Sequence, residues 1–377
     1  MTENRPAAVT IIAEAGVNHN GSLDMALRLV DAAADAGADM VKFQTFKAEK
    51  LVTRATPKAA YQVRNTGSDD GQLKMLRRLE LDEAAHHRLV EHCVARGIGF
   101  LSTPFDDEST DFLVGRLGVD TLKVGSGDMT NGPHLLRLAA IGTDIILSTG
   151  MATLSEVEEA LGVLAHGLLG RDAPGSAAFS AAFEDPEGKR LLAEKVTLLH
   201  CTSNYPAPAD EINLAVIDLY EKVFPCVVGF SDHSDGIAIP IAAVARGARM
   251  IEKHLTLDRA LPGPDHVASI EPMAFAEMVR GIREVTAAIG VGVKVPTAGE
   301  RNTMVVARKS LVAARPIAVG EIFDRDSVVI KRPGNGMAPN RIWDIVGRRA
   351  TRSYAPDDLV AEELEPSLSR KSEASDR

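Results

Sequence analysis

Eight short apolar runs recur along the first 290 residues, and a polar cluster directly follows each of them. Runs that are apolar throughout, without alternation, are typical of parallel strands covered on both faces. Helical segments separate the runs, so the pattern predicts a (β/α)8 TIM barrel with its chemistry at the carboxyl ends of the strands. An open, doubly wound sheet is the alternative, but it gives no reason for a polar cluster after every strand. The predicted strands are 9–13, 40–43, 98–101, 121–124, 144–147, 196–200, 226–230 and 250–251.

The chain continues beyond the predicted barrel domain, which spans residues 1–290. Glycines and a proline make 291–305 a predicted linker. Short β-like runs separated by Pro and Gly turns predict a small β-rich domain over 306–365. The polar end, 366–377, is expected to be disordered.

Two segments interrupt the regular alternation of the barrel. The first, 46–81, is polar and charged in its middle part, so we expect a loop over the active site. The second, 166–194, is rich in Ala, Gly and Pro and is expected to form a short helical hairpin on the surface.

Composition limits the partners of the chain. The formal net charge is -10 and aromatic residues make up only 4%, whereas nucleic acid requires a basic footprint and often stacking rings. No apolar run approaches the roughly 20 residues of a spanning helix, and the first ten residues lack the apolar core of a signal peptide. The three cysteines lack CxxC spacing and are expected to be reduced thiols. We therefore expect a cytoplasmic protein that binds neither nucleic acid nor membrane.

Two polar clusters place a histidine at the ends of neighbouring strands, in Ser231-Asp232-His233 and Glu252-Lys253-His254. A strand–helix–strand unit brings both ends to the same rim, where two imidazoles can hold one divalent cation. The alternative is that each histidine is only hydrogen-bonded at the rim. Because the two occur together, we predict a metal site formed by His233 and His254.

Charged side chains occur at or just beyond the ends of other strands. Such buried charges need a partner or a ligand, so they either pair with one another or bind substrate. The lysines favour an anionic substrate, since Lys is a compact charge suited to phosphate. Serines beside Gly or Thr on three successive loops favour a phosphate cradle, although a serine in such a loop is often only a helix cap. The charged residues are Glu14, Lys42, Lys123 and Asp128, and the serines are Ser126, Ser148 and Ser203.

Two turn-rich loops carry further candidate residues. Asp265 follows a Pro-Gly-Pro turn whose fixed geometry suits a reader of a substrate hydroxyl, and a plain structural turn is the alternative. Arg332 lies on a tight turn beyond the linker, where a solvated hairpin is the alternative. An arginine there becomes desolvated only against an anion, a carbonyl or a partner surface. Reciprocal exchange in a two-fold dimer supplies such a surface, so we predict that Arg332 completes the other subunit's site.

Taken together, the motifs at the strand ends resemble those of the sialic acid synthase family, over roughly residues 9 to 364. In that family the small C-terminal domain is called the SAF domain and is similar to type III antifreeze proteins. The motifs are IAEAGVNHNG, VKFQT, STPF, KVGSGD, LSTGM, HCTSNYPAP, GFSDHS, EKHLTLDRALPGPDH and KRPGNG.

The resemblance implies an enzyme that condenses phosphoenolpyruvate with an open-chain N-acylated hexosamine of the N-acetylmannosamine type, giving N-acetylneuraminate or a close relative and phosphate. It implies Mn2+ or Mg2+ bound by His233 and His254, and it makes Glu14 the carboxylate that positions or deprotonates a water. It also implies a domain-swapped homodimer in which Arg332 enters the partner's barrel. The implied phosphoenolpyruvate residues are Lys42, Lys123, Ser126, Ser148, Ser203 and Ser231, and those on the sugar side are Gln44, Thr103, Asp128, Tyr205 and Asp265.

The chain departs from the family pattern in three places. Asp128 replaces a Glu found in many members, Ser203 replaces an Asn found in some, and 61–81 is more similar to legionaminate-type synthases. N,N'-diacetyllegionaminate synthesis from 2,4-diacetamido-2,4,6-trideoxymannose is therefore an alternative. A Schiff-base aldolase using Lys42 or Lys123, or a carbohydrate-binding protein, are alternatives of a different class.

Overall fold

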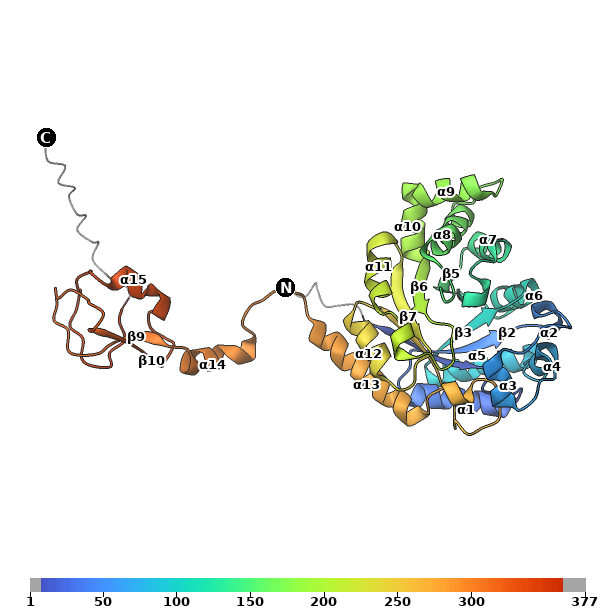
Figure 1. Cartoon of the computed structure of the whole chain (residues 1–377), viewed down its shortest axis with the longest axis horizontal. Helices are drawn as coiled ribbons and strands as arrows, with labels where there is room; N and C mark the ends of the chain where they lie inside the picture. Colours follow the sequence, from blue (N-terminus) through green and yellow to red (C-terminus); the bar gives the residue numbers. More distant parts are fainter. Residues whose placement is uncertain (1–7, 362–377) are drawn as a thin grey trace. The chain divides into compact units, whose positions relative to one another are not determined.

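The computed structural model describes residues 8–361 and contains a closed barrel of eight parallel strands, which confirms the predicted TIM barrel (Figure 1). Each strand pairs with the next along the chain, and β1 also pairs with β8 to close the ring. The strands are β1 (Thr10–Gly16), β2 (Met40–Thr45), β3 (Gly99–Pro104), β4 (Thr121–Val124), β5 (Asp144–Ser148), β6 (Val196–Cys201), β7 (Val227–Asp232) and β8 (Met250–His254).

Helices surround the barrel and pack their apolar faces on its outer wall (Figure 1). Several begin at the caps that the sequence provides: Ser22 accepts a hydrogen bond from the Met25 amide, and Thr153 forms a capping box with Glu156. The surrounding helices are α1 (Leu23–Asp35), α5 (Glu83–Arg96), α6 (Asp107–Asp111), α7 (Gly132–Ile141), α8 (Leu154–Leu168), α11 (Ala215–Val223), α12 (Ala238–Ala245) and α13 (Pro272–Ile289).

The barrel interior changes from apolar to polar along the strands. A small apolar cluster fills its lower part, and the next inward position on each of these strands, two residues later, carries a polar or sulfur-containing side chain. The inward side chains of the strands therefore form a polar layer, which is the cavity floor, directly above an apolar layer. The cluster is Ile12, Leu101, Ile146 and Leu199, and the inward residues that follow are Glu14, Thr103, Ser148 and Cys201.

The segment 46–81, named here the cover segment, is not the polar loop that we expected. It forms three short helices, α2 (Ala48–Leu51), α3 (Ala60–Thr66) and α4 (Gln72–Arg77). Met75, Leu76 and Leu79 recur at helical spacing and pack in a separate small core with Phe46. The polar residues of its middle part masked this apolar stripe.

The insertion 166–194 is helical, but its predicted start was wrong. The helix α8 continues to Leu168, because Leu161, Leu164 and the buried His166 extend its buried face. The remaining residues form α9 (Ser176–Glu184) and α10 (Pro186–Lys195), which pack on α8 (Figure 1).

The contacts divide the chain into two units, the first ending at Val291 and the second beginning at Gly292. In the second, β9 (Ser310–Ala313) pairs antiparallel with β10 (Val328–Lys331), near a short helix α15 (Ile342–Ile345) and a separate apolar core. The predicted linker 291–305 contains the start of a helix, α14 (Ala298–Ala307), which Thr297 and Glu300 begin with a capping box. The tail predicted at 366–377 lies outside the described residues.

Candidate active site

A cavity of about 610 Å³ lies at the carboxyl ends of the barrel strands. Most of the residues predicted for the site line it. These are Glu14, Lys42, Gln44, Thr103, Lys123, Ser126, Ser148, Ser203, Tyr205, Ser231, His233, His254 and Asp265.

Four buried charged groups form a network on the cavity floor. Lys42 Nζ lies 2.8 Å from Glu14 Oε2 and 3.7 Å from Glu252 Oε2, and Lys123 Nζ lies 3.4 Å from Glu252 Oε1. Ser231 Oγ donates to Glu252 Oε1 at 2.9 Å. All four charged side chains are at most 5% exposed, so each depends on the others or on a ligand.

The two carboxyls of this network have opposite pKa shifts. Burial raises the pKa of Glu14 to about 7, although Lys42 acts in the other direction. Burial also disfavours ionised Glu252, but Lys123 and Lys42 outweigh it and hold the pKa of this carboxyl at about 2. One carboxyl can therefore exchange a proton near neutral pH, while the other stays ionised.

The two histidine rings are neighbours, with centroids 5.5 Å apart and planes tilted by 59°. His233 Nδ1 is 2.7 Å from the Thr202 carbonyl oxygen, so a proton on Nδ1 donates there and leaves Nε2 free as a metal ligand. His254 Nδ1 is buried and has no hydrogen-bond partner in the described part of the chain. Burial lowers the pKa of both imidazoles, which favours the neutral form that binds metal. This arrangement fits a divalent cation, for which His233 and His254 would be the protein ligands.

Hydroxyl groups and a backbone amide gather beside Lys123. Its Nζ donates to Ser148 Oγ at 2.7 Å, and the Gly150 amide lies 2.9 Å from Ser126 Oγ. A Cβ on Gly150 would lie 2.3 Å from Ser203 Oγ and 2.8 Å from Ser126 Oγ. Only glycine allows these hydroxyls to lie so close to the backbone at position 150, which favours a built anion site.

The cover segment supplies the opposite wall of the cavity. Tyr61 stacks on Tyr205 with ring centroids 5.2 Å apart, and Tyr205 lies against His233 at 4.2 Å. Asn65 Nδ2 donates to the Pro264 carbonyl at 2.6 Å, which ties this segment to the loop that carries Asp265. The cover-segment residues that line the cavity are all uncharged: Leu51, Val52, Ala59, Tyr61, Gln62, Gln72, Met75, Leu76 and Leu79.

Two predicted site residues are not among those that line the cavity. Asp128 accepts a hydrogen bond from Asn131 Nδ2 at 3.2 Å in the turn after β4. Arg332 belongs to the second unit, where its Nε donates to the Ala307 carbonyl at 3.1 Å.

Sequence reasoning missed Glu252 and Tyr61. The signal for Glu252 was present, because it precedes His254 by two residues on a strand and so faces the same side. Tyr61 lay in a stretch taken for a loop, where no periodicity indicated its direction.

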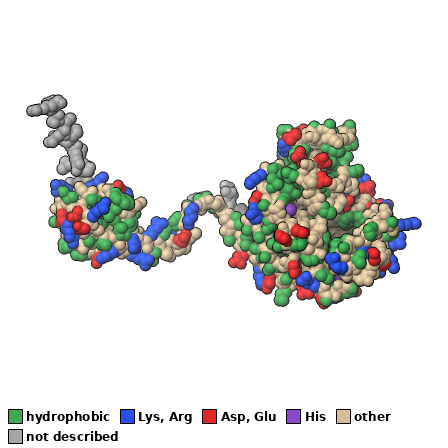
Figure 2. Space-filling model, viewed as in Figure 1, with side chains coloured by type: hydrophobic (Ala, Val, Ile, Leu, Met, Phe, Trp, Pro, Cys, Tyr) green, Lys and Arg blue, Asp and Glu red, His purple; other side chains and the backbone are tan. Residues whose placement is uncertain are grey.

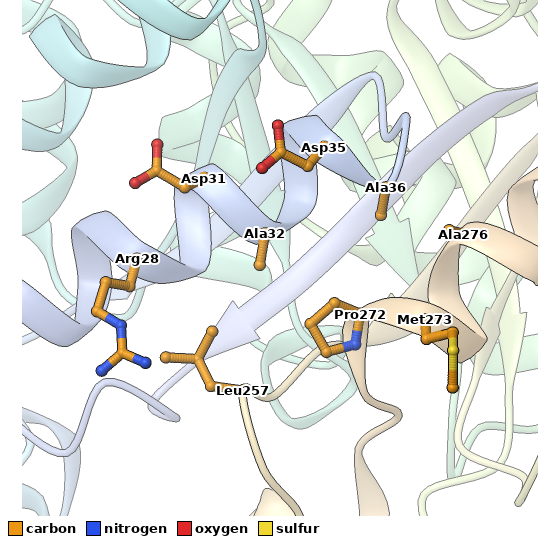
Figure 3. A pocket seen from close by; sticks show the side chains of 9 residues that line it. All are labelled: Arg28, Asp31, Ala32, Asp35, Ala36, Leu257, Pro272, Met273 and Ala276. Atoms are coloured by element: carbon orange, nitrogen blue, oxygen red, sulfur yellow. The ribbon is translucent and has the colours of Figure 1, made fainter.

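Other surface features of the barrel unit do not resemble a catalytic site. A hollow of about 560 Å³ lies between α1 and the start of α13 (Figure 3). Its aspartates, Asp31 and Asp35, pair with Arg96, and the other residues that line it are Arg28 and apolar side chains. Figure 2 shows acidic and basic side chains interspersed on the visible face of this unit, without a large patch of one sign. No described helix is long and apolar enough to cross a membrane.

Comparison with known proteins agrees with the resemblance seen in the sequence. The NeuB family matches residues 29–294, and the SAF domain matches residues 308–363. An N,N'-diacetyllegionaminic acid synthase of Campylobacter jejuni is 45% identical, over 93% of this chain and 98% of the relative. An N-acetylneuraminate-9-phosphate synthase of Homo sapiens is 34% identical, over 94% of this chain and 92% of the relative.

A solved structure extends the agreement to three dimensions. The N-acetylneuraminic acid synthetase of Leptospira borgpetersenii, in complex with citrate, has a TM-score of 0.62 and 33% sequence identity. The similarity covers 79% of this chain and 90% of that chain. The match of the family over most of the barrel, together with relatives this similar over nearly their whole length, shows that the chain belongs to the NeuB family and carries a C-terminal SAF domain.

Proposed function

We propose that this chain joins phosphoenolpyruvate to the open-chain aldehyde of an N-acylated hexosamine, giving a nonulosonic acid and phosphate. The observation that carries the proposal is the presence of two buried lysines and two facing imidazoles in one cavity. The lysines suit an anionic phosphoester and its carboxylate. The imidazoles suit a divalent cation. The names of the relatives support a synthase of this class.

The anion site is the proposed seat of phosphoenolpyruvate. Lys123, Ser126, Ser148 and Ser203 line the cavity there and can donate hydrogen bonds to a phosphate, while the Gly150 amide donates to Ser126 Oγ and holds that hydroxyl in place. Lys42 and Ser231 both contact Glu252. We place the carboxylate of phosphoenolpyruvate beside these two residues.

A metal at His233 and His254, Mn2+ or Mg2+, supplies Lewis-acid polarisation of the aldehyde oxygen when bound. Two observations support this placement. His233 is held in one tautomer by the Thr202 carbonyl, and the buried Nδ1 of His254 lacks a partner among the described residues. The protein thus holds the His233 ring before a ligand arrives and leaves a buried ring nitrogen of His254 without a partner in the described part of the chain.

In the proposed reaction Glu14 accepts a proton, and Glu252 stabilises a positive charge. Attack of the enol carbon on the aldehyde forms the carbon–carbon bond. The neighbouring carbon, which bears the phosphate oxygen and the carboxylate, is left electron-deficient. Water adds to that carbon, and ionised Glu14 accepts its proton. Glu252, held ionised by the two lysines, stabilises the positive charge while it exists. The former aldehyde oxygen takes that proton from Glu14. Phosphate then leaves with the electrons of its carbon–oxygen bond and takes the proton of the added hydroxyl, so that a keto acid remains.

The cover segment bears on which hexosamine is used. Its cavity-lining residues are uncharged and largely apolar, and Asp265 lies on the same side of the cavity. A phosphate on the far end of the acceptor would lose its hydration there without a cation from this segment. We therefore propose an unphosphorylated acceptor. The apolar wall favours 2,4-diacetamido-2,4,6-trideoxymannose, with its methyl group and second amide, over N-acetylmannosamine.

One observation favours a different chemistry. Burial lowers the pKa of Lys123, as in lysines that form Schiff bases. A pyruvate-dependent aldolase is the resulting second candidate. Borohydride trapping in the presence of pyruvate separates the two, since only an imine is trapped.

The assembly and location of the protein are further parts of the proposal. The exposed Arg332 on the second unit supports a domain-swapped homodimer in which this arginine reaches the partner's sugar site. The three buried free cysteines and the net charge of -10 support a cytoplasmic protein without nucleic-acid or membrane partners.

The test is phosphate release from phosphoenolpyruvate with each candidate acceptor, in the presence of Mn2+ or Mg2+, with a mass spectrum of every product. We expect release with the diacetamido sugar, weaker release with N-acetylmannosamine, and little with its 6-phosphate. Absence of release with every acceptor would overturn the proposed reaction, and efficient use of the 6-phosphate would overturn the assignment of the acceptor alone.

A further inference from the structure

Asp232 and Lys253 form an ion pair in the outer layer of the barrel wall. They are direct neighbours in the register of β7 and β8, and their side chains are 0% and 2% exposed. Because side chains alternate along a strand, both point away from the cavity into which Ser231, Glu252 and His254 point. The pair thus occupies a layer that apolar side chains otherwise fill.

A buried ion pair at this position is a poor source of stability. Two charges removed from water lose hydration that their mutual attraction barely restores, and an apolar pair of similar volume is often as stable or more stable. Packing alone therefore gives no reason for Asp232 and Lys253.

The remaining hydrogen bonds of the pair point to a different role. Asp232 Oδ1 accepts from the Ser234 amide at 2.9 Å, and Lys253 Nζ donates to the Ser234 carbonyl at 2.9 Å. Both backbone groups of Ser234 are thus held by side chains from the outer layer. His233 lies between Asp232 and Ser234, and its own carbonyl accepts from the Ala207 amide at 2.8 Å.

We infer that Asp232 and Lys253 are positioning residues for the metal ligand His233. The pairing of β7 with β8 ends at Asp232 and Lys253, and beyond it a bridge between Ser234 and Ala207 holds the backbone on the side of β6. The ion pair replaces the missing ladder and joins that backbone to β8, which carries His254. It thereby fixes the separation of the two imidazoles. This inference rests on the proposed metal site.

The test is a double variant, Asp232→Leu with Lys253→Met, in which an apolar pair replaces the ionic one. We expect the folded protein to keep or raise its thermal midpoint without metal, while the Kd for Mn2+ rises about 10-fold or more. Free Mn2+ is measured by its electron paramagnetic resonance signal during titration, so activity is not the readout. Asp232→Val with Lys253→Leu, a smaller apolar pair that also removes the hydrogen bonds to Ser234, carries the same test if the first variant does not fold.

Ile251→Val is the matched control, because Ile251 is fully buried on β8 but takes no part in the ion pair. It should lower the thermal midpoint and leave the Kd for Mn2+ unchanged. A folded double variant that binds Mn2+ as tightly as the natural chain would overturn the inference, since the pair would then be structural only. If the natural chain itself bound no Mn2+, the metal site in the proposed function would be wrong, and the positioning role of Asp232 and Lys253 would be wrong with it.

Discussion

The strand ends and the cover segment build the two sides of one cavity in opposite ways. The strand ends contribute buried charges whose positions follow from the register of the barrel, such as Glu14 opposite Lys42 and Glu14 opposite His254. The cover segment contributes uncharged side chains from short helices that pack in a core of their own.

This difference suggests a division of labour. Chemistry requires side chains held to within a fraction of an ångström, and neighbouring strands provide that precision. Selection among acceptors requires only a wall of suitable shape and polarity, which a separately packed segment can change without disturbing the floor. The two regions should therefore respond differently to substitution, with loss of turnover on one side and altered acceptor binding on the other.

The largest effect is expected at the imidazoles. His233→Ala or His254→Ala should abolish turnover and weaken Mn2+ binding, because each removes one of the two proposed metal ligands, while circular dichroism should show an intact fold. Near-normal rates in both variants after exhaustive chelation and Mn2+ titration would contradict the metal assignment.

Glu14→Gln should lower kcat about 10²-fold or more, the usual size for a general acid–base group. Since Glu14 must be ionised to accept a proton and burial raises its pKa to about 7, kcat/KM of the natural chain should rise with pH through about 7. The variant should lose that limb and still bind phosphoenolpyruvate, as measured by calorimetry. An unchanged kcat would reduce Glu14 to a structural role.

Substitutions in the cover segment should act on the acceptor alone. Tyr61→Ala removes the ring that stacks on Tyr205, and an aromatic contact of this kind is worth about 0.5–1.5 kcal/mol. We expect the KM for the hexosamine to rise roughly 3- to 10-fold, since 1.4 kcal/mol corresponds to a factor of ten, with the KM for phosphoenolpyruvate unchanged.

Arg64→Ala is the matched control for Tyr61→Ala. Arg64 is exposed on the same helix and does not line the cavity, so its removal should leave both KM values unchanged. If Tyr61→Ala raised both KM values equally, the cover segment would support the whole site rather than select the acceptor.

The same division explains what the sequence could predict. Barrel strands are short, apolar and regularly spaced, and polar residues in or just after their carboxyl-terminal halves lie at the rim. His233, His254, Lys42 and Lys123 could therefore be assigned to one site. Glu252 could have been found from its spacing to His254. By contrast, Tyr61 reaches the cavity only through the packing of α3 and the tie between Asn65 and Pro264, a contact across 199 residues that no local pattern contains.

Asp128 shows that a matching motif does not determine the direction of a side chain. The motif around it matched, but the turn after β4 directs its carboxylate to Asn131, three residues along the same chain. A matching sequence thus placed the residue near the site without determining which way its side chain points.

The most specific prediction, with the smallest measured signal, concerns Arg332 and its proposed place in the partner's sugar site. If the subunits exchange these domains, a mixed dimer of an Arg332→Ala chain and a His233→Ala chain has one site carrying both lesions and one carrying neither. Half of all dimers are mixed after random assembly, so about one site in four should regain activity. Co-expression of differently tagged chains, followed by phosphate release before and after separation of the mixed dimers, measures this fraction. If Arg332 instead served the barrel of its own chain, every site in the mixed dimer would carry one lesion, and no activity would return.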